Sequence, residues 1–420
     1  MVLRIFNTKS GRDEVFETHK EGRVAMYVCG PTTYDYSHVG HARSYVFYDV
    51  VRRYLTFLCL RVTYVQNFTD IDEKITKRAK ALGEGPFELS KRFIQAFLED
   101  MDALDVMRAD HNPRTSENIQ DVVAMARRLL EKGVAYEVGG TVYFDVMKRA
   151  GFGSLLHEPL SNVTVENGDA TASEGRRGPL DFVVWKKGDE WGMSWDSPWG
   201  KGRPGWHSEC SVMSRRFLGD VIDIHGGGLD LIYPHHESEA ALSFALTGKE
   251  PVRFYMHNGF VVQDEVKMSK SKGNFTTVRA LLKEWDGDGS LIRYFLLTKH
   301  YRKTLAYSKM AMSTAEERFD TIREAASWTK KRVRGPEVAE EGKDRKRASG
   351  EGGDCPDRYF EFERLFLEAM DDDFDTAHAL TVVHDMANCV LRNRPSKVDA
   401  ENALRVFEMV ETILGIRLLD

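Results

Sequence analysis

Residues 38–41 read His-Val-Gly-His and combine side chains that could bind the phosphates of a nucleotide. The segment opens a helical pattern, and the start of a helix attracts anions through its unpaired N–H groups and partial positive charge. Gly40 would let a nucleotide approach the backbone, and the imidazoles of His38 and His41 can donate to phosphoryl oxygens. Taken alone, however, the segment fits a polar helix cap better than a catalytic motif.

Residues 267–271 read Lys-Met-Ser-Lys-Ser and are a second candidate for phosphate chemistry. The ammonium groups of Lys267 and Lys270 stand on flexible stems that could close over a triphosphate and offset charge on the leaving pyrophosphate. An isolated pair of lysines with this spacing is more often a solvated basic turn. The occurrence of both segments in one domain favours the catalytic interpretation.

Four further residues could together bind a metal ion. His235 and Glu239 stand four residues apart in a helical pattern and share one face, which Leu242 continues, so this face points inward. Cys29 ends one predicted strand, and Cys210 begins the second half of the domain. Two thiolates, one imidazole and one carboxylate make a plausible tetrahedral zinc set. Spacing alone leaves three competing ligands: His207, His236 and Glu237.

The elements that would position these residues follow a βαβ pattern. Residues 24–28 and 62–67 predict buried strands, and the apolar residues between 42 and 58 recur at helical spacing. A strand, a helix and a second strand in this order favour a parallel sheet with a right-handed crossover. The pattern resumes with a strand over 221–225 and a helix over 234–246.

The change of pattern along the chain divides it into four segments. The first half of a Rossmann-like catalytic domain covers 1–117, and a connective insertion covers 118–203. The second half, which contains the lysine-rich loop, covers 204–312, and helical patterns dominate from 313 to 420. The predicted fold class is therefore α/β: a Rossmann-like parallel sheet split by an insertion and followed by an α-helical bundle.

The composition is that of an ordinary cytoplasmic protein. Among 420 residues there is no run of about 18 apolar residues that would span a membrane, and the N-terminus turns polar too quickly for a signal peptide. The five cysteines are few, odd in number and scattered, which fits a reducing compartment. Because the net charge is −6, any nucleic-acid site must depend on local basic patches.

The two phosphate-binding candidates resemble the pair of signatures found in class I aminoacyl-tRNA synthetases. Four further segments resemble the cysteine-specific family of these enzymes: 27–32 (YVCGPT), 205–210 (GWHSEC), 225–228 (HGGG) and 234–239 (PHHESE). The likeness runs from about residue 20 to about residue 310. It implies a ligase that activates cysteine with ATP to cysteinyl-adenylate and transfers the cysteine to tRNA-Cys.

The resemblance also implies a role for each candidate residue. One zinc ion per chain would be bound by Cys29, Cys210, His235 and Glu239. The catalytic residues, acting on ATP accompanied by Mg²⁺, would be His38, His41, Lys267 and Lys270. The ATP-binding residues would be Gly40, His41, His225, Gly227, Asp230 and Lys270. The cysteine pocket would be lined by Thr69 and Trp206. The expected partners are tRNA-Cys, cysteine and ATP, and the enzyme is expected to be a monomer in the cytoplasm with no membrane association.

Zinc has a clear use in an enzyme that must distinguish cysteine from serine. Packing alone separates such similar side chains poorly. Zinc binds thiolate strongly and deprotonates a coordinated thiol, whereas a serine hydroxyl stays protonated and binds weakly. An open zinc position would thus supply selectivity without an editing domain.

The sequence departs from the family in two places. Position 238 is serine where the family more often has asparagine, but this position lies off the ligand face. Residues 371–377 resemble the family's helical-bundle signature, and the bundle would bind tRNA. The sequence stops soon after 413–416, whereas many relatives continue into a small domain that reads the anticodon. We therefore expect no full C-terminal anticodon domain.

Two other functions fit parts of the sequence. One is a related ligase that joins cysteine to an amino-sugar inositol in mycothiol synthesis, without tRNA. Residues 67–70 and 73–75, the intact HGGG segment and the helical bundle argue against it. The other is an inactive paralogue that senses cysteine or binds RNA. Loss of a lysine or histidine from the two signature loops would mark such a protein, and none is lost.

Overall fold

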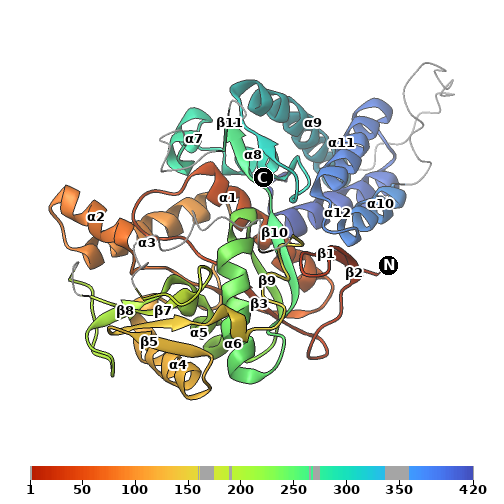
Figure 1. Ribbon diagram of the computed structural model, residues 1–420. Coiled ribbons are helices and arrows are strands. Elements are labelled where there is room, and N and C mark those ends of the chain that lie inside the picture. Colours follow the sequence, from red (N-terminus) through yellow and green to blue (C-terminus); the bar gives the residue numbers. More distant parts are fainter. Residues whose placement is uncertain are drawn as a thin grey trace.

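The centre of the computed structural model is a four-stranded parallel sheet in the order β10-β9-β3-β4 (Figure 1). Its strands are β3 (Arg23–Val28), β4 (Arg61–Gln66), β9 (Ile222–Gly228) and β10 (Val252–Asn258). Because all four run the same way, their carboxyl ends meet at one edge, where Val28 lies opposite Gln66 and Gly226. Ligands of open parallel sheets bind at this edge. The structure describes residues 2–158, 160, 175–188, 192–263, 266–267, 275–335 and 359–419.

Helices cover both faces of the parallel sheet. On one face lies α1 (Val39–Phe57), and on the other lie α5 (Trp206–Leu218) and α6 (Glu237–Thr247). Successive residues of β3 point to opposite faces, so Met26 packs in the core with α1 while Tyr27 packs in the core with α5 and α6. The predicted βαβ unit is confirmed, and the resemblance to a Rossmann-like sheet is confirmed with it.

A second sheet is inserted between β4 and β9. Its strands are antiparallel, in the order β5 (Ala135–Val138), β6 (Thr141–Phe144), β7 (Phe182–Lys187) and β8 (Gly202–Pro204). The helix α4 (Ile119–Glu131) packs on it through an apolar stripe that includes Val122 and Leu129. The helices α2 (Glu73–Leu82) and α3 (Pro86–Ala103) lie beside this sheet in Figure 1.

The C-terminal part of the described chain is helical, as expected. Its helices are α7 (Val278–Glu284), α8 (Gly289–Leu297), α9 (Lys309–Arg334), α10 (Phe360–Asp371), α11 (Thr376–Asn393) and α12 (Lys397–Leu414). The first bundle helix, α9, begins four residues earlier than the segment predicted from the sequence, because the side chain of Ser308 accepts the N–H of Ala311 and caps it. None of the helices in the described ranges has the length and apolarity needed to cross a bilayer.

Short strands complete the fold at its edges. The hairpin of β1 (Arg4–Asn7) and β2 (Arg12–Val15) packs beside β10. A small sheet combines β11 (Val261–Gln263), β12 (Val266–Lys267) and β13 (Leu305–Ala306). The strands β11 and β12 lead into and out of residues 264–265, and the described chain resumes at 275 after the lysine-rich loop.

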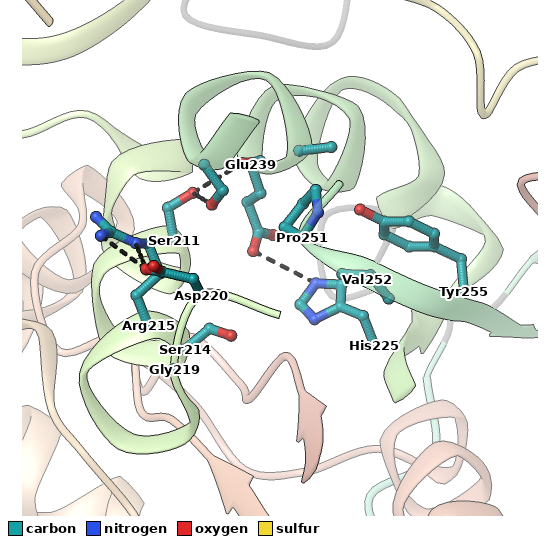
Figure 2. Close-up of a pocket in the computed structure, with 12 residues that line it drawn as sticks. Ser211, Ser214, Arg215, Gly219, Asp220, His225, Glu239, Pro251, Val252 and Tyr255 are labelled. Carbon is teal, nitrogen blue, oxygen red and sulfur yellow. Dashed lines mark hydrogen bonds and ion pairs between the residues drawn. The ribbon is translucent and has the colours of Figure 1, made fainter. Parts of the chain in front are cut away.

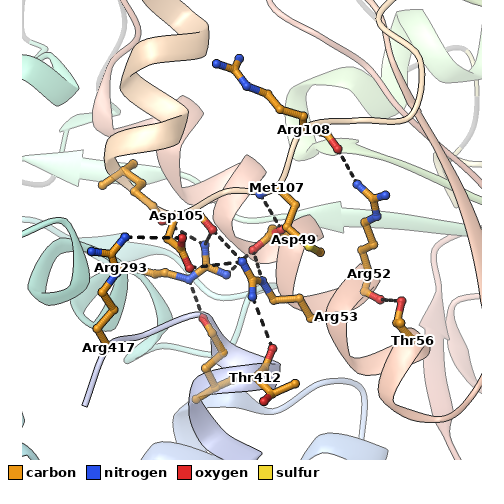
Figure 3. Close-up of polar contacts among 12 residues, drawn as sticks. Asp49, Arg52, Arg53, Thr56, Asp105, Met107, Arg108, Arg293, Thr412 and Arg417 are labelled. Atoms are coloured by element: carbon orange, nitrogen blue, oxygen red, sulfur yellow. Dashed lines mark hydrogen bonds and ion pairs between the residues drawn. The ribbon is translucent and has the colours of Figure 1, made fainter. Parts of the chain in front are cut away.

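A buried ion pair between α1 and α8 lies where the sheet domain meets the bundle (Figure 3). Arg293 of α8 is completely buried, and its Nη2 donates to Oδ2 of Asp49 on α1. The Nε of Arg53 donates to the same carboxylate oxygen over 2.7 Å. Arg293 also donates to the carbonyl oxygen of Leu414 at the end of α12. This one guanidinium therefore connects α1, α8 and α12.

Candidate active site and metal centre

The four predicted zinc ligands converge in the structure. The ligand atoms of Cys29, Cys210, His235 and Glu239 all lie within 4.8 Å of one another, and all four residues are buried. The two sulfur atoms are 3.8 Å apart and belong to free cysteines. The Nε2 of His235 lies 3.0 Å from Oε1 of Glu239. Two sulfurs, one imidazole nitrogen and one carboxylate oxygen thus form a compact donor set.

These four residues come from three different elements around the carboxyl edge of the sheet. Cys29 directly follows the last residue of β3, and Cys210 lies on the first turns of α5. Glu239 lies in the first turn of α6, whereas His235 precedes that helix in the segment Ile232–His236, whose backbone is not helical at Tyr233. The predicted helix over 234–246 therefore begins later than expected, but the spacing of four residues still brings His235 and Glu239 together.

A second set of four potential ligands overlaps the first. It consists of Cys29, His225, His236 and Glu239. The Nε2 of His236 lies 3.3 Å from Sγ of Cys29, so this residue remains the competing ligand that the sequence indicated. The Nε2 of His225 lies 3.3 Å from Oε2 of Glu239, as Figure 2 shows. Cys29 and Glu239 therefore belong to both sets, which the first set completes with Cys210 and His235 and the second with His225 and His236.

The other two competing ligands face different partners. The Nδ1 of His207 lies 3.1 Å from Nδ1 of His235, behind the donor set. An outer partner of this kind fixes the orientation of a metal-binding imidazole. Burial lowers the pKa of His207 to about 3, so its ring is neutral. The carboxylate of Glu237 accepts the N–H of Leu155 over 2.8 Å.

The protonation of the donor set follows from burial and close packing. Burial, followed by the neighbouring Cys210, raises the pKa of the Cys29 thiol. The hydrogen bond from Cys29 lowers the pKa of Cys210 to about 6 against the opposing effect of burial. Burial would lower the pKa of His235, but the Glu239 carboxylate raises it to about 10. Burial would likewise favour the neutral acid at Glu239, yet His235 and His225 hold its pKa below the usual range.

A chain of histidines extends from the donor set into the protein. The Nδ1 of His236 lies 2.8 Å from Nε2 of His257 on β10, and Nδ1 of His257 lies 2.8 Å from the hydroxyl of Thr8. Sequence spacing did not indicate His257, because it lies on a strand far along the chain from Cys29 and shares no motif with it.

The two residues expected to line the cysteine pocket lie beside the donor set. The ring of Trp206 stacks on His235 with centroids 4.3 Å apart. The hydroxyl of Thr69 accepts from the side-chain amide of Asn67, just beyond the end of β4. Gly30 allows the segments after β3 and β4 to cross, since a Cβ there would lie 1.6 Å from the carbonyl oxygen of Asn67. This close approach brings Cys29 and Thr69 to the same edge.

The structure places His38 and His41 at the N-terminus of α1, as expected for a phosphate site. Each Nδ1 accepts the other residue's backbone N–H, over 3.2 and 3.3 Å, in a reciprocal capping box. The two rings stack with centroids 3.7 Å apart. Since Nδ1 is an acceptor in both rings, the proton of the neutral imidazole resides on Nε2, which is then a donor. A Cβ at Gly40 would lie 2.9 Å from the ring of His38, so the glycine makes this stacking possible.

The lysine-rich loop is only partly within the described residues. Lys267 ends β12, where its backbone pairs with Val262, whereas Lys270 lies outside the described residues. The segment that follows the loop is hydrogen-bonded to the residues around the start of α1. The N–H of Val39 donates to the carbonyl oxygen of Thr276 over 3.0 Å, and the N–H of Val278 donates to that of Ser37 over 2.9 Å. These bonds bring the end of the loop segment beside the His-Val-Gly-His segment.

Arg43 makes a further link between the two signature segments that the sequence did not reveal. It is 2% exposed, and its Nη1 donates to the carbonyl oxygen of Phe260 over 2.7 Å, immediately before β11. Its Nη2 donates to the carbonyl oxygen of His300 over 3.2 Å. The helix that carries His41 therefore holds the base of the hairpin that leads into the lysine-rich loop.

The glycine-rich segment at the end of β9 carries His225, Gly227 and Asp230, three of the residues expected to bind ATP. His225 is 2% exposed, and its Nε2 lies 3.3 Å from Oε2 of Glu239, beside the candidate metal ligands. Gly226 is needed for packing, since a Cβ would lie 2.4 Å from the ring of Tyr48. The hydroxyl of Tyr48 also accepts the N–H of Gly227 over 2.7 Å. Asp230 is exposed on the 3₁₀ turn that follows.

A pocket opens on the other side of the donor set, between α5, α6, β9 and β10. Figure 2 shows two contacts among its lining residues, one between Glu239 and His225 and one between Arg215 and Asp220. Nδ1 of His225 and the hydroxyl of Tyr255 are buried here without a hydrogen-bond partner among the described residues. Such groups are commonly satisfied by buried water.

Comparison with known families identifies two regions of the chain. Residues 15–317 match the family described as the tRNA synthetases class I (C) catalytic domain. Residues 365–419 match the DALR domain.

Individual relatives agree over nearly the whole chain. A cysteine–tRNA ligase of Heliobacterium modesticaldum is 43% identical over 100% of this chain and 87% of its own length. One of Thermococcus onnurineus is 44% identical over 99% and 87%. One of Geobacillus thermodenitrificans is 40% identical over 99% and 87%.

Solved structures agree with the fold at much lower identity. A Mycobacterium tuberculosis methionyl-tRNA synthetase in complex with methionyl-adenylate has a TM-score of 0.64 at 17% identity, covering 93% of this chain and 89% of that one. An Agrobacterium radiobacter LeuRS in a ternary complex with tRNA and LeuAMS has a TM-score of 0.67 at 12% identity, covering 95% and 85%. At this identity the likeness concerns the fold.

Proposed function

Since this chain belongs to the cysteine–tRNA ligase family, which joins cysteine to tRNA with ATP, we propose that one zinc ion at Cys29, Cys210, His235 and Glu239 selects the cysteine substrate. The observation that carries the proposal is the approach of these four ligand atoms to within 4.8 Å of one another. The donor set fits zinc because zinc prefers sulfur and imidazole ligands in a tetrahedral arrangement. When bound, zinc would favour the substrate thiolate over a serine hydroxyl.

The protein groups around the donor set would hold the substrate in place. Trp206 stacks on His235 and would cover the cysteine side chain, and Thr69 would line the pocket from the end of β4. His207 would hold the ring of His235 in its orientation from the side away from Glu239. His225 would hold the second carboxylate oxygen of Glu239. This placement supports a role for His225 at the metal centre in addition to the ATP contact that the family resemblance implies.

ATP would bind at the N-terminus of α1 with Mg²⁺ on its phosphates. In the first step the cysteine carboxylate attacks the α-phosphate, and pyrophosphate leaves. The Nε2–H groups of His38 and His41 would donate to the phosphoryl oxygens, and Lys267 and Lys270 would offset the charge on the leaving group. Gly40, Gly227 and Asp230 would contact the nucleotide. In the second step a ribose hydroxyl of the terminal adenosine of tRNA attacks the adenylate carbonyl, and AMP leaves.

The family membership also supports a proposal for the domain boundaries, the tRNA-binding region and the oligomeric state. Residues 1–117 and 204–312 would form the catalytic domain around the insertion of 118–203. The match of residues 365–419 to the DALR domain supports tRNA binding by the helical bundle over 313–420. We expect one zinc ion per chain and a monomeric enzyme.

Substrate selection tests the proposed function directly. The purified enzyme is expected to exchange pyrophosphate into ATP with cysteine and to discriminate against serine by roughly 10⁴-fold or more, since a site built around one polar contact rejects the analogue that lacks it. It should then charge tRNA-Cys and leave an amino-sugar acceptor unmodified. Removal of zinc with a chelator should abolish the exchange with cysteine. Exchange that survives complete loss of the metal would contradict the role given to zinc.

His38→Asn tests the phosphate site. Asparagine retains an oxygen that can cap α1, but it lacks the imidazole N–H. The rate of adenylate formation is expected to fall by about 10²–10³-fold, which is typical of removing one preorganised donor to a transition state. Cysteine binding without ATP should stay within about twofold, because contacts made in the transition state affect turnover rather than ground-state binding. Rapid quench and equilibrium dialysis measure the two quantities.

The matched control for this variant is His378→Asn, at an exposed histidine of α11 whose backbone, not its side chain, takes part in the helix cap. It should form adenylate at the normal rate. A normal rate in His38→Asn as well would remove His38 from the catalytic residues.

A further inference from the structure

One exposed face of α2 is strongly cationic in a protein whose net charge is −6. The helix has ten residues and turns Ile75, Thr76 and Ala79 inward. Its outward cationic side chains are Lys74, Lys77, Arg78 and Lys80. The only carboxylate on the helix is Glu73, which pairs with Lys77 over 2.6 Å. Arg78 lies 3.9 Å from the carboxylate of Asp35, so Lys74 and Lys80 are the two cations of this face that form no ion pair among the described residues.

The cationic face of α2 lies close to the proposed cysteine pocket, because only a few residues separate α2 from Thr69. The helix begins four residues after Thr69, at the carboxyl edge of the sheet, where Asp72 caps it by accepting the N–H of Lys74. In Figure 1, α2 lies at the outer end of the α2–α3 hairpin, beside the inserted sheet. The rings of Phe87, at the start of α3, and Trp195, in the insertion, make an edge contact with centroids 6.4 Å apart.

The insertion adds positive charge opposite the start of α2. Lys186 on β7 and Arg203 on β8 both contribute to lowering the pKa of Glu73, after the hydrogen bond from Lys77, which has the largest effect. Arg203 stands three residues before Trp206, at the other wall of the expected cysteine pocket. Its Nη1 is buried without a hydrogen-bond partner among the described residues. A buried donor of this kind is unfavourable unless a water molecule or a ligand accepts its hydrogen bond.

We propose that the cationic face of α2, together with Arg203, binds the phosphate backbone of the 3′ end of tRNA and directs it to the cysteinyl-adenylate. This inference rests on the proposed function, because the terminal ribose must reach the space between Thr69 and Trp206. The negatively charged strand that precedes this ribose must leave the pocket over a neighbouring surface. α2 follows Thr69 in the chain and β8 precedes Trp206, so these two elements border the two walls of the pocket. Lysine and arginine contacts to phosphates supply affinity and salt dependence without reading sequence.

The double variant Lys74→Gln/Lys80→Gln tests the proposal in the full-length enzyme. Neither lysine takes part in an ion pair among the described residues, and glutamine keeps a high helix propensity. At about 150 mM salt, kcat/KM for tRNA-Cys should fall roughly tenfold or more. The dependence of log kcat/KM on log salt should become shallower by about 1.4, which is two contacts at about 0.7 each for a single strand. Cysteine-dependent pyrophosphate exchange, which involves no tRNA, should stay within about twofold.

The control is Arg12→Gln/Lys20→Gln, which removes two exposed positive charges beside the β1–β2 hairpin, on the other side of the molecule from α2 (Figure 1). It should retain both activities and the original salt dependence. Unchanged charging and salt dependence in the α2 variant would overturn the proposal, and so would an equal loss of pyrophosphate exchange. Failure of the proposed function is distinguishable, because the unmodified enzyme itself would then not exchange pyrophosphate with cysteine.

Arg203 provides an independent arm of the test. In a single turnover from preformed adenylate, Arg203→Gln should slow transfer to tRNA roughly tenfold or more, as expected for the loss of a charged hydrogen bond. Arg203→Lys, which keeps the charge, should recover part of that rate. Transfer at the normal rate in Arg203→Gln would show that this guanidinium does not bind tRNA.

Discussion

Cys210→Ala is expected to lose both the bound metal and the activation of cysteine. The substitution removes one of two sulfur ligands whose atoms stand 3.8 Å apart. Loss of even an outer partner of a metal ligand costs roughly 10–100-fold in affinity or activity, so loss of a ligand should cost more than about 100-fold. Elemental analysis of the purified variant measures the metal, and cysteine-dependent pyrophosphate exchange measures activation. Both should fall together.

Two control variants make this result specific. Cys59→Ala changes an exposed, free cysteine at the end of α1 and should retain one zinc ion per chain with full activity. His236→Asn changes the nitrogen that lies 3.3 Å from Cys29 and belongs to the alternative donor set. It should also retain the metal. If Cys210→Ala kept a full equivalent of zinc while His236→Asn lost it, the ion would belong to the alternative set.

The parallel sheet could be predicted because its signals are local. A buried strand, a helix with an apolar stripe and a second strand follow one another within 24–67, and their order determines a parallel crossover. The helical spacing of His235 and Glu239 was equally informative, since two side chains four residues apart lie on the same face of a helical segment, and the two side chains are in contact in the structure. Such features depend only on the backbone near each residue.

The set of candidate metal ligands could not be obtained from spacing. Cys29 and Cys210 are separated by 181 residues, and only the family resemblance paired them. His225 and His257 come to the site on neighbouring strands of the sheet, so their proximity depends on strand order. The Gly226 contact with Tyr48 likewise depends on a helix packing over β9. Long-range contacts of this kind leave no periodic signal in the sequence.

The sequence also contained no sign that Arg293 would be buried. We expect this residue to contribute strongly to the free energy of unfolding. Burial lowers the pKa of Arg293 and favours its neutral form, while the Asp49 carboxylate opposes that effect. The guanidinium donates to the carbonyl oxygens of Leu104 and Asp105 over 3.1 and 3.2 Å, in addition to its bonds to Asp49 and to the end of α12.

Arg293→Met is therefore expected to destabilise the protein strongly. The variant fills a similar volume but leaves a buried carboxylate with Arg53 as its remaining charged partner, and breaking a buried pair from one side costs about 3–5 kcal/mol. Urea denaturation followed by circular dichroism should show a midpoint well below that of the unmodified protein. Arg364→Met is the control, because Arg364 pairs only with Glu361 and Glu368 on the exposed surface of α10, where such pairs contribute less than about 1 kcal/mol. A loss of similar size in both variants would show that the buried pair contributes no more to stability than an exposed pair.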